Sequence, residues 1–426
     1  MKKYSEMNKN ELMEEFELVK AEYEQIKSRG LKLNLERGKP GGEQLNLVSP
    51  INDILTRDSD YICDGIDVRN YGNVDGLPCA KRLFADILGT KEENVFVGGN
   101  ASLQLMYSII SIGFSNGLKN SLKPWCKEQK VKWLCPVPGY DRHFKVTESF
   151  GFELIPVRLN SDGPDMDTVE KLIKDDSVKG MWCVPKYSNP DGIIYSSDVI
   201  DRIASMKPAA SDFALMWDNA YCVHEFNGEY VEFPDIISLC EQYGNPDMVY
   251  EFASTSKITF PGAGISCFAT SAENIKYLNK IFNVQIISYD KINQYRHVLY
   301  LKDKKNTLDL MKKHAAVLKP KFDAVFDLLE NEIKPRGIGR WTEPDGGYFI
   351  SYFAYPGTAK RTNTLCKEAG LSMTAAGATY PYGIDPEDSN LRIAPSMPSL
   401  DDVKNAMELF CICQRYSAIE KILEKK

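Results

Sequence analysis

The run STSKITFPGAGIS places one lysine, Lys257, among small hydroxyl residues and beside a Pro-Gly turn, with no other charge in the run. An amine attacks a carbonyl carbon only in its unprotonated form, so a reactive lysine needs surroundings that lower its pKa. A segment this poor in charge meets that need. Lysines are most often solvated surface cations, so an ordinary loop lysine is the alternative that the run alone leaves open.

Two further side chains suited to chemistry follow an apolar run. Asp218 comes directly after FALMW, and Tyr221 stands three residues later. A carboxylate at the end of a buried strand needs a partner, which a protonated pyridine nitrogen, a helix N-cap or an internal salt bridge would each provide. Tyr221 would either donate a hydrogen bond to a phenolate oxygen or pack as an ordinary half-buried tyrosine.

The run VGGNASLQLMYSII has the pattern of a strand, a glycine turn and an apolar helix. Backbone N–H groups at a helix start, together with the positive end of the helix dipole, suit a phosphate group. Gly99, Asn100 and Ala101 would form such a cradle. The alternative is a plain strand-to-helix turn capped by Asn100 or Ser102.

Other candidate ligand-binding residues are spread along the chain. Tyr140 in PGYDRHF offers an aromatic face, and His143 in the same run could hydrogen-bond to Asp218. Asn189 in SNPDG would donate to a ligand oxygen or belong to an ordinary Asn-Pro turn. Arg392, in the apolar run LRIAPS, needs a partner, which a substrate carboxylate or an internal aspartate would supply. Taken together, these groups are what pyridoxal phosphate requires: a lysine, a carboxylate for the ring nitrogen, an aromatic face and a phosphate cradle.

The elements that must position these side chains alternate between strand and helix. Apolar runs of strand length, such as NVFVGG, VKWLCPVP, FELIPVRL, VKGMWCVP and FALMWD, alternate with helical runs such as SLQLMYSIISIGF and SDVIDRIASM. Continuous apolar strands separated by helices predict an α/β fold with a mainly parallel sheet covered on both faces. Ligands bind at the carboxyl ends of the strands in such sheets, and the candidate residues follow the strands in the sequence.

The two ends of the chain have a different pattern. Helical spacing is clear in ELMEEFELVKAEYEQIK near the N-terminus. From about residue 308, a long helical run is followed by GYFISYFAY, LRIAPSM and a final helical run. We expect a large cofactor-binding domain over residues 50–307 and a smaller α+β domain formed by residues 1–49 and 308–426.

The composition is that of a globular protein with a substantial core. Of the 426 residues, 43% are hydrophobic and 26% charged, and the net charge of −7 argues against a nucleic-acid surface. The eleven cysteines include no CxxC pair and are scattered through apolar runs, which favours buried, reduced thiols. The N-terminal run lacks the apolar core of a signal peptide, and no run reaches the length of a membrane span. We therefore expect a cytoplasmic protein that binds neither a membrane nor a nucleic acid.

The motifs GKP, YGNVDG, GGNAS, PGYDRH, SNPDG, DNAY, STSK and LRIAPS occur in this order over nearly the whole chain. In this combination the sequence resembles the class I aminotransferases, which are fold-type I pyridoxal-phosphate enzymes. The runs ERGKPG, PGYDRHF and SKITFPGAGIS are most similar to the divergent bacterial aspartate aminotransferases often called type 1c. The resemblance implies a large domain with a mainly parallel, seven-stranded type of sheet, a smaller α+β domain and no metal.

The resemblance also implies a role for each candidate residue. Lys257 would form a Schiff base with the cofactor and then move a proton, and Asp218 would keep the pyridine nitrogen protonated. The remaining implied roles are phenolate hydrogen bonds from Asn189 and Tyr221, ring stacking by Tyr140, phosphate binding by Gly99, Asn100, Ala101, Ser254 and Ser256, a contribution of Tyr71 from the other subunit of a homodimer, and binding of the substrate α-carboxylate by Gly38, Asn189 and Arg392.

The substrate is implied by the resemblance alone. It implies transfer of an amino group between L-aspartate and 2-oxoglutarate in a ping-pong reaction, and Arg296, Arg142 and Arg37 are candidates for binding a distal carboxylate. An aminotransferase for aromatic or other neutral amino acids, or a β-lyase or decarboxylase on the same fold, stays open. One departure concerns the phosphate, because many relatives carry an arginine shortly after the lysine, where ITFPGAGIS has no cation.

Overall fold

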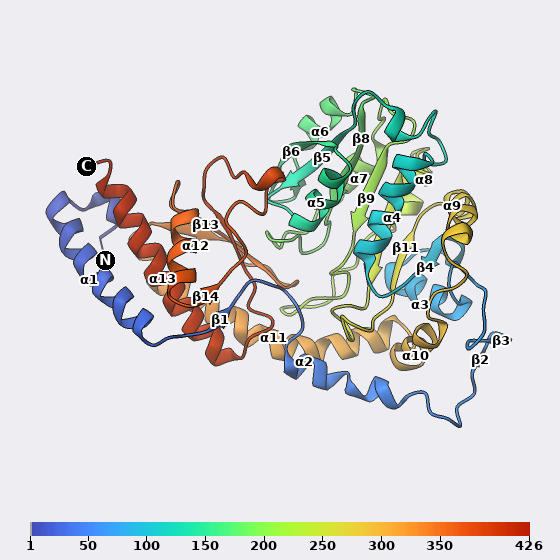
Figure 1. The fold of residues 1–426 in the computed structure, drawn as a ribbon, viewed down its shortest axis with the longest axis horizontal. Coiled ribbons are helices and arrows are strands. Elements are labelled where there is room, and N and C mark those ends of the chain that lie inside the picture. The colour runs from blue at the N-terminus through green and yellow to red at the C-terminus, as the bar shows by residue number, and fades with distance from the viewer. Residues whose placement is uncertain (1) are drawn as a thin grey trace.

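The computed structural model describes residues 2–426, and its central feature is an eight-stranded sheet (Figure 1). The strand order is β4-β11-β10-β9-β8-β5-β6-β7. Neighbours from β10 to β6 are parallel, whereas β11 is antiparallel to both of its neighbours and β7 is antiparallel to β6. The bounds are β4 Val95–Val97, β5 Lys132–Val137, β6 Glu153–Asn160, β7 Gly163–Pro164, β8 Val178–Cys183, β9 Ala214–Asp218, β10 Val249–Ser254 and β11 Ser266–Ala269.

The sheet confirms the predicted α/β class with a mainly parallel sheet. Seven of its strands have three or more residues, and the two-residue β7 at the edge is the eighth. The antiparallel β11 was not predicted, because its run SCFA is short and directly follows a loop rather than a helix. β11 still lies inside the sheet, between β4 and β10.

Helices cover both faces of this sheet, as the continuous apolar strands require. In β9, Leu215 and Trp217 pack into one apolar core, while Ala214 and Met216 pack into the core on the opposite face. The first core also contains residues of α3 (Pro78–Leu88), α6 (Met166–Leu172), α7 (Ser197–Ser205) and α8 (Ile236–Gln242). The second contains residues of α4 (Ser102–Ser115), α5 (Asp141–Ser149) and α9 (Ala272–Gln285).

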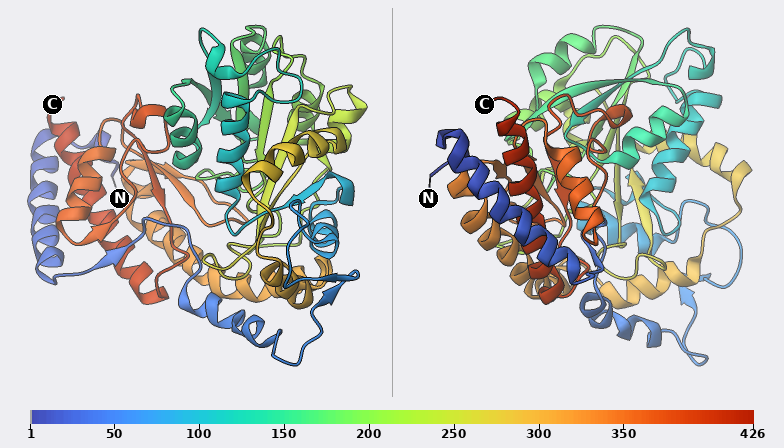
Figure 2. Two further views of the ribbon diagram at one scale, coloured as in Figure 1. Left: turned by 45° about the vertical axis from the view of Figure 1, so that its right-hand side comes forward. Right: turned by 60° about the vertical axis from the view of Figure 1, so that its left-hand side comes forward.

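A third core joins the two ends of the chain. The last helix, α13 (Leu400–Leu423), packs against α1 (Lys9–Ser28), α11 (Lys304–Glu332) and α12 (Ala359–Glu368) (Figure 2). A three-stranded antiparallel sheet, β12 (Gly339–Trp341), β13 (Ile350–Ala354) and β15 (Asn390–Ile393), belongs to the same region. The strand β1 (Leu33–Asn34) pairs in parallel with β14 (Leu371–Ser372), so the N-terminal segment and the C-terminal part of the chain share one unit.

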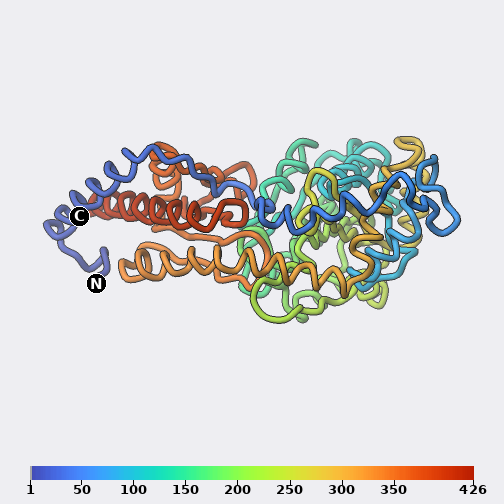
Figure 3. The backbone as a smooth tube through the Cα atoms, turned by 90° about the horizontal axis from the view of Figure 1, so that it is seen from below, coloured from blue at the N-terminus to red at the C-terminus, as the bar shows by residue number. Residues whose placement is uncertain are grey.

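The predicted domain bounds at residues 49/50 and 307/308 stay a prediction. The helix α11 begins at Lys304 and runs between the two groups of elements (Figure 3). Met311 of this helix packs into a core of the large sheet, and Leu318, two turns later, packs into the third core. The remaining helices and strands are α2 (Gly42–Leu47), α10 (Lys291–Leu301), β2 (Ile62–Cys63) and β3 (Ile66–Asp67).

The cysteines differ in part from the sequence-based expectation. Nine are free thiols and eight of these are buried, but Cys126 is exposed. Cys63 and Cys79 form a disulfide, so the expectation that all eleven are reduced is wrong for this pair. The two residues are 16 apart in the sequence, and no local motif marks them. Within residues 2–426, no helix combines the length and the apolar character that crossing a membrane requires.

Candidate active site

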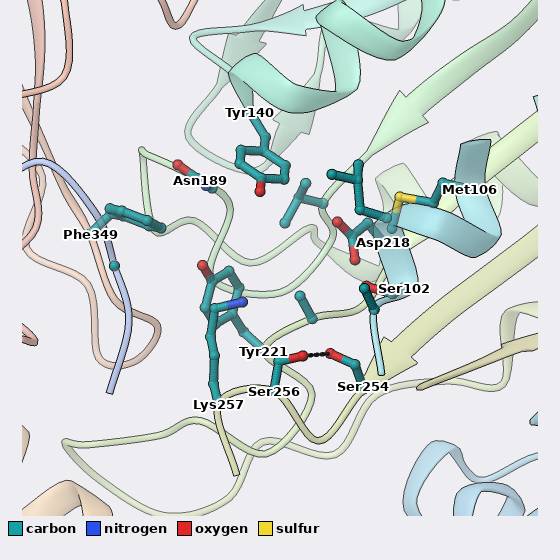
Figure 4. A pocket seen from close by; sticks show the side chains of 15 residues that line it. Ser102, Met106, Tyr140, Asn189, Asp218, Tyr221, Ser254, Ser256, Lys257 and Phe349 are labelled. Carbon is teal, nitrogen blue, oxygen red and sulfur yellow. Dashed lines mark hydrogen bonds between the residues drawn. The ribbon is translucent and has the colours of Figure 1, made fainter. Parts of the chain in front are cut away.

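A cavity of about 200 Å³ lies at the carboxyl ends of the parallel strands (Figure 4). It is lined by segments that follow β4, β5, β8, β9 and β10, the edge at which α/β sheets bind ligands. Nine of the residues expected at the site line it, namely Gly38, Ala101, Tyr140, Asn189, Asp218, Tyr221, Ser254, Ser256 and Lys257.

Lys257 lies in a turn three residues after the end of β10. Its Nζ atom is 4.7 Å from the ring centroid of Tyr221, and the hydroxyl of Tyr348 donates to its backbone oxygen (3.3 Å). The side chain is partly exposed to the cavity, but protein atoms surround it closely enough that desolvation lowers its pKa, while Asp218 has the smaller, opposite effect. The site therefore favours the unprotonated amine that attack on a carbonyl requires.

Asp218, the last residue of β9, has one oxygen fixed and one oxygen free. Nε2 of His143 donates to its Oδ2 (2.8 Å), which confirms the hydrogen bond expected from the sequence. The His143 ring in turn stacks on Trp182, with 4.4 Å between centroids and 10° between planes. The other oxygen, Oδ1, is buried and has no hydrogen-bond partner within residues 2–426. An unpartnered buried carboxylate oxygen is costly, so its place at the cavity fits a positively charged donor on a ligand.

Two tyrosines stand near Asp218 and Lys257 in the same cavity (Figure 4). Tyr140 precedes α5, and burial raises its pKa to about 12. Burial also raises the pKa of Tyr221 well above its ordinary value. Both phenols are therefore neutral near pH 7, and each is able to donate a hydrogen bond to a ligand oxygen.

A patch of hydroxyl groups and a helix start form one end of the cavity. Ala101 is the N-cap residue of α4, and Ser102 is its first residue. Ser254 Oγ donates to Ser256 Oγ (3.1 Å), and Ser256 Oγ donates to the backbone oxygen of Asn100 (3.3 Å). Hydroxyls beside the positive end of a 14-residue helix suit an anion such as phosphate.

No arginine supports this end of the cavity from the turn after Lys257. An ideal Cβ atom on Gly264 would lie 2.8 Å from Thr255 Oγ1 and 3.1 Å from the backbone oxygen of Phe260, so a side chain does not fit there without rearrangement. Among the described residues that line the cavity, Lys257 is the one cation. The charge of a phosphate would thus be met by the hydroxyls and the start of α4.

Arg392 of β15 is buried and lies behind Asn189 rather than in the cavity wall. One of its terminal nitrogens, Nη1, donates to Asp141 Oδ1 (2.9 Å) and to Asn189 Oδ1 (3.3 Å), and Nη2 donates to Thr374 Oγ1 (3.0 Å). The guanidinium carbon lies 4.8 Å from the ring centroid of Phe349. Of the two partners that the sequence left open for Arg392, the structure contains the internal aspartate.

Three of the expected phosphate ligands do not line the cavity. Gly99 and Asn100 stand just before Ala101; the backbone oxygen of Gly99 accepts from Ser266 (2.7 Å), and the side chain of Asn100 donates to the backbone oxygen of Pro261 (3.3 Å). Tyr71 is 79% exposed and lies outside the cavity of its own chain. Its assignment to the other subunit of a dimer stays a prediction.

The candidate arginines for a distal carboxylate also lie outside the cavity wall. Arg37 and Arg142 are exposed, and Arg296 of α10 donates to Asn293 Oδ1 (2.5 Å). The second carboxylate of a dicarboxylic substrate therefore has no arginine within the described lining of this single chain.

Sequence reasoning assigned no ligand role to several residues of this region. Asp141 and Ser102 adjoin residues that it selected, and Ser102 was considered only as a helix cap. Phe349 and Thr374, which surround Arg392, come from parts of the chain whose runs give no sign of a site. The approach of these segments depends on how the third core packs against the large sheet.

The residues present fit pyridoxal phosphate. The free Oδ1 of Asp218 suits a protonated ring nitrogen, and the low-pKa amine of Lys257 suits a carbonyl carbon. The hydroxyl patch at the start of α4 suits the phosphate, and the two neutral phenols suit the ring and its oxygen substituent.

Comparisons with known proteins agree with this reading of the cavity. A family model described as "Aspartate amino-transferase" matches residues 7–426. The chain is 46% identical over 402 residues to the aspartate aminotransferase of Corynebacterium glutamicum, a match covering 94% of this chain and 93% of that protein. The crystal structure of an aspartate transaminase from C. glutamicum superposes with a TM-score of 0.96 at 44% identity, over 99% of both chains. An α-aminoadipate aminotransferase from Thermus thermophilus, complexed with N-(5'-phosphopyridoxyl)-L-leucine, shares the fold, with a TM-score of 0.74 at 18% identity over 94% of this chain and 96% of that one.

Proposed function

We propose that this chain, which belongs to the aspartate aminotransferase family, transfers the amino group of L-aspartate to 2-oxoglutarate, giving oxaloacetate and L-glutamate. The observation that carries the proposal is that Lys257 and the unpartnered Oδ1 of Asp218 line the same cavity. Pyridoxal phosphate would be held by Lys257, Asp218, and the hydroxyls of Ser254 and Ser256 beside the start of α4. When bound, it supplies an electron-withdrawing ring that stabilises negative charge at the substrate α-carbon.

Lys257 has the central part in this proposal. The site lowers the pKa of the Lys257 Nζ atom, which favours the unprotonated amine. This amine would take the proton from the α-carbon of the amino donor and, in the second half of the reaction, return a proton to the α-carbon of the amino acid that is formed. The turn after β10 fixes the backbone of this residue, since Tyr348 donates to the Lys257 carbonyl oxygen. The amine is then free to move while its attachment point stays in place.

Asp218 and its neighbours act on the ring. Oδ1, which has no partner within the described residues, would hold the proton on the ring nitrogen, and His143 keeps the carboxylate in place through Oδ2. Tyr221 and Asn189 would donate hydrogen bonds to the ring oxygen, and Tyr140 would lie against the ring face. These assignments are supported by the common position of the residues around one cavity.

The substrate α-carboxylate would bind to Arg392, with Gly38 and Asn189 at its side. A guanidinium binds a carboxylate through charge-assisted hydrogen bonds, and Asn189 joins Arg392 to the cavity wall. The preference for a dicarboxylic acid is supported by the similarity to aspartate aminotransferases. We further propose that the protein is a cytoplasmic homodimer in which Tyr71 reaches the phosphate held by the other subunit. Cell fractionation tests the location, and the mass of the protein in solution tests the dimer.

A steady-state assay tests the activity. The protein loaded with pyridoxal phosphate is given L-aspartate and 2-oxoglutarate, and oxaloacetate and L-glutamate are measured. We expect equal amounts of both products and parallel lines in double-reciprocal plots, since the first product leaves before the second substrate binds. L-Tyrosine and L-phenylalanine serve as competing donors; higher kcat/KM with them, or pyruvate or carbon dioxide released without an oxo acid acceptor, would refute the proposal.

A further inference from the structure

The guanidinium of Arg392 already forms an ion pair with a carboxylate of its own chain. Asp141 Oδ1 accepts from Arg392 Nη1 at 2.9 Å. The same nitrogen donates to Asn189, and Asn189 is part of the cavity wall. Nη1 is therefore the terminal nitrogen joined to the cavity, and Asp141 takes up one of its two donor positions.

The carboxylate of Asp141 is placed so that it binds Nη1 of Arg392 and is also able to leave it. It is the first residue of α5, directly after Tyr140, so its backbone is fixed by the helix that also carries His143. Its side chain is 28% exposed, whereas that of Arg392 is only 7% exposed. The carboxylate of Asp141 is thus in contact with solvent and is able to rotate into it, while the guanidinium stays buried.

We propose that Asp141 occupies the place on Arg392 that a substrate carboxylate takes, and that it thereby sets the affinity of the site for carboxylates. The inference rests on the proposed function, since that function assigns Arg392 to the α-carboxylate. An incoming carboxylate must displace Asp141 from Nη1 or share the guanidinium with it. Either event costs free energy, because a buried charge pair is broken or two like charges approach each other.

The competition has a second consequence for the reaction. Amino acids and 2-oxo acids both carry the carboxylate that Arg392 would bind, so Asp141 weakens the binding of all four substrates and products alike. Since the transition state carries the same carboxylate, this uniform effect raises KM and speeds product release but leaves the chemical step itself nearly unchanged. Asp141 is thus a residue that sets affinity without taking part in proton transfer.

The test compares three variants of the protein loaded with pyridoxal phosphate. Asp141→Asn keeps an oxygen that accepts from Arg392 but removes the negative charge. Asp141→Glu keeps the charge, and Glu148→Gln removes one negative charge from the same helix, where Glu148 pairs with Lys145 at 2.6 Å. The probe is maleate, a dicarboxylate without an amino or oxo group, and binding is measured by calorimetry and by the shift in thermal midpoint.

We expect Asp141→Asn to bind maleate about fivefold to tenfold more tightly than the unchanged protein. Glu148→Gln is expected to bind as the unchanged protein does, and Asp141→Glu to bind within about twofold of it. KM for L-aspartate and for 2-oxoglutarate should fall by a common factor in Asp141→Asn, with a smaller change in kcat.

Each outcome decides a different point. If the unchanged protein transaminates L-aspartate but Asp141→Asn binds maleate equally well or more weakly, the inference is wrong and the proposed function stands. The same holds if Glu148→Gln tightens binding as much as Asp141→Asn, since the effect would then be one of net charge. If the unchanged protein neither binds maleate nor transaminates L-aspartate, both the inference and the proposed function fail.

Discussion

Gly38 offers a sharp test of how the carboxylate end of the site is packed. An ideal Cβ atom at this position would lie 2.4, 2.7 and 3.0 Å from the Cζ, Cε1 and Cε2 atoms of Phe349. Ordinary carbon contacts are about 3.5–4.0 Å, so the ring must retreat by about 1 Å to admit one methyl group. That ring is 5% exposed, lines the cavity and lies 4.8 Å from the guanidinium carbon of Arg392.

We expect Gly38→Ala to affect both stability and substrate binding. Overpacking of this kind costs about 1–3 kcal/mol, which lowers the thermal midpoint. Displacement of Phe349 disturbs Arg392, so KM for both substrates should rise by about tenfold, the factor that corresponds to 1.4 kcal/mol. Gly42→Ala is the matched control, because nothing lies within 4 Å of its ideal Cβ and it is the first residue of α2.

The assay measures thermal midpoints and KM values for both variants under the same conditions. Gly42→Ala is expected to match the unchanged protein or exceed its thermal midpoint, since alanine favours a helix over glycine. If Gly38→Ala behaves as Gly42→Ala does in both measurements, Phe349 is free to move, and the packing described for this end of the site is wrong.

Three further predictions concern buried groups. In the native protein, burial raises the pKa of Glu251 from 4.5 to about 8. As the pH rises from 4.5 to 8, the unfolded chain therefore loses this proton before the native protein does, and the free energy of unfolding falls. Glu251→Gln should therefore raise the thermal midpoint at pH 8 but not at pH 4.5; an equal effect at both pH values would contradict this reasoning. Lys257→Met should raise the thermal midpoint of the cofactor-free protein, more at pH 7 than at pH 10, because burial lowers the lysine pKa and a buried ammonium is costly below it. An unchanged midpoint at pH 7 would show that this lysine is well solvated. His143→Leu leaves Oδ2 of Asp218 without its donor, and a fluorescence titration should show pyridoxal phosphate binding about 10- to 100-fold more weakly; unaltered affinity would mean that the hydrogen bond has no effect on the site.

The sheet and much of the cavity could be predicted because their signals are local. Apolar runs set the strands, and the polar residues that follow them meet wherever parallel strands end at one edge. Asp218 and Lys257 were selected in this way and line one cavity in the structure. The hydrogen bond between His143 and Asp218 was also expected, although 75 residues separate the two.

Other features depend on contacts that no local pattern records. The pair of Asp141 and Arg392 joins residues 251 apart, on α5 and on β15. Nothing in GGYFISYF shows that Phe349, which belongs to the third core, also lies against the guanidinium of Arg392. The disulfide between Cys63 and Cys79 likewise depends on how the loop before α3 folds back on its first turn.

The most direct test of the account follows the cofactor's absorbance in the loaded protein after addition of L-aspartate alone. The unchanged protein and Lys276→Ala, which alters a lysine 70% exposed on α9, should convert the cofactor to its aminated form and release oxaloacetate. Lys257→Ala should release it at least about 1,000-fold more slowly. Oxaloacetate release by Lys257→Ala at the rate of the unchanged protein, or no response of the unchanged protein to L-aspartate, would contradict the central claim that Lys257 transfers the proton in an aspartate aminotransferase.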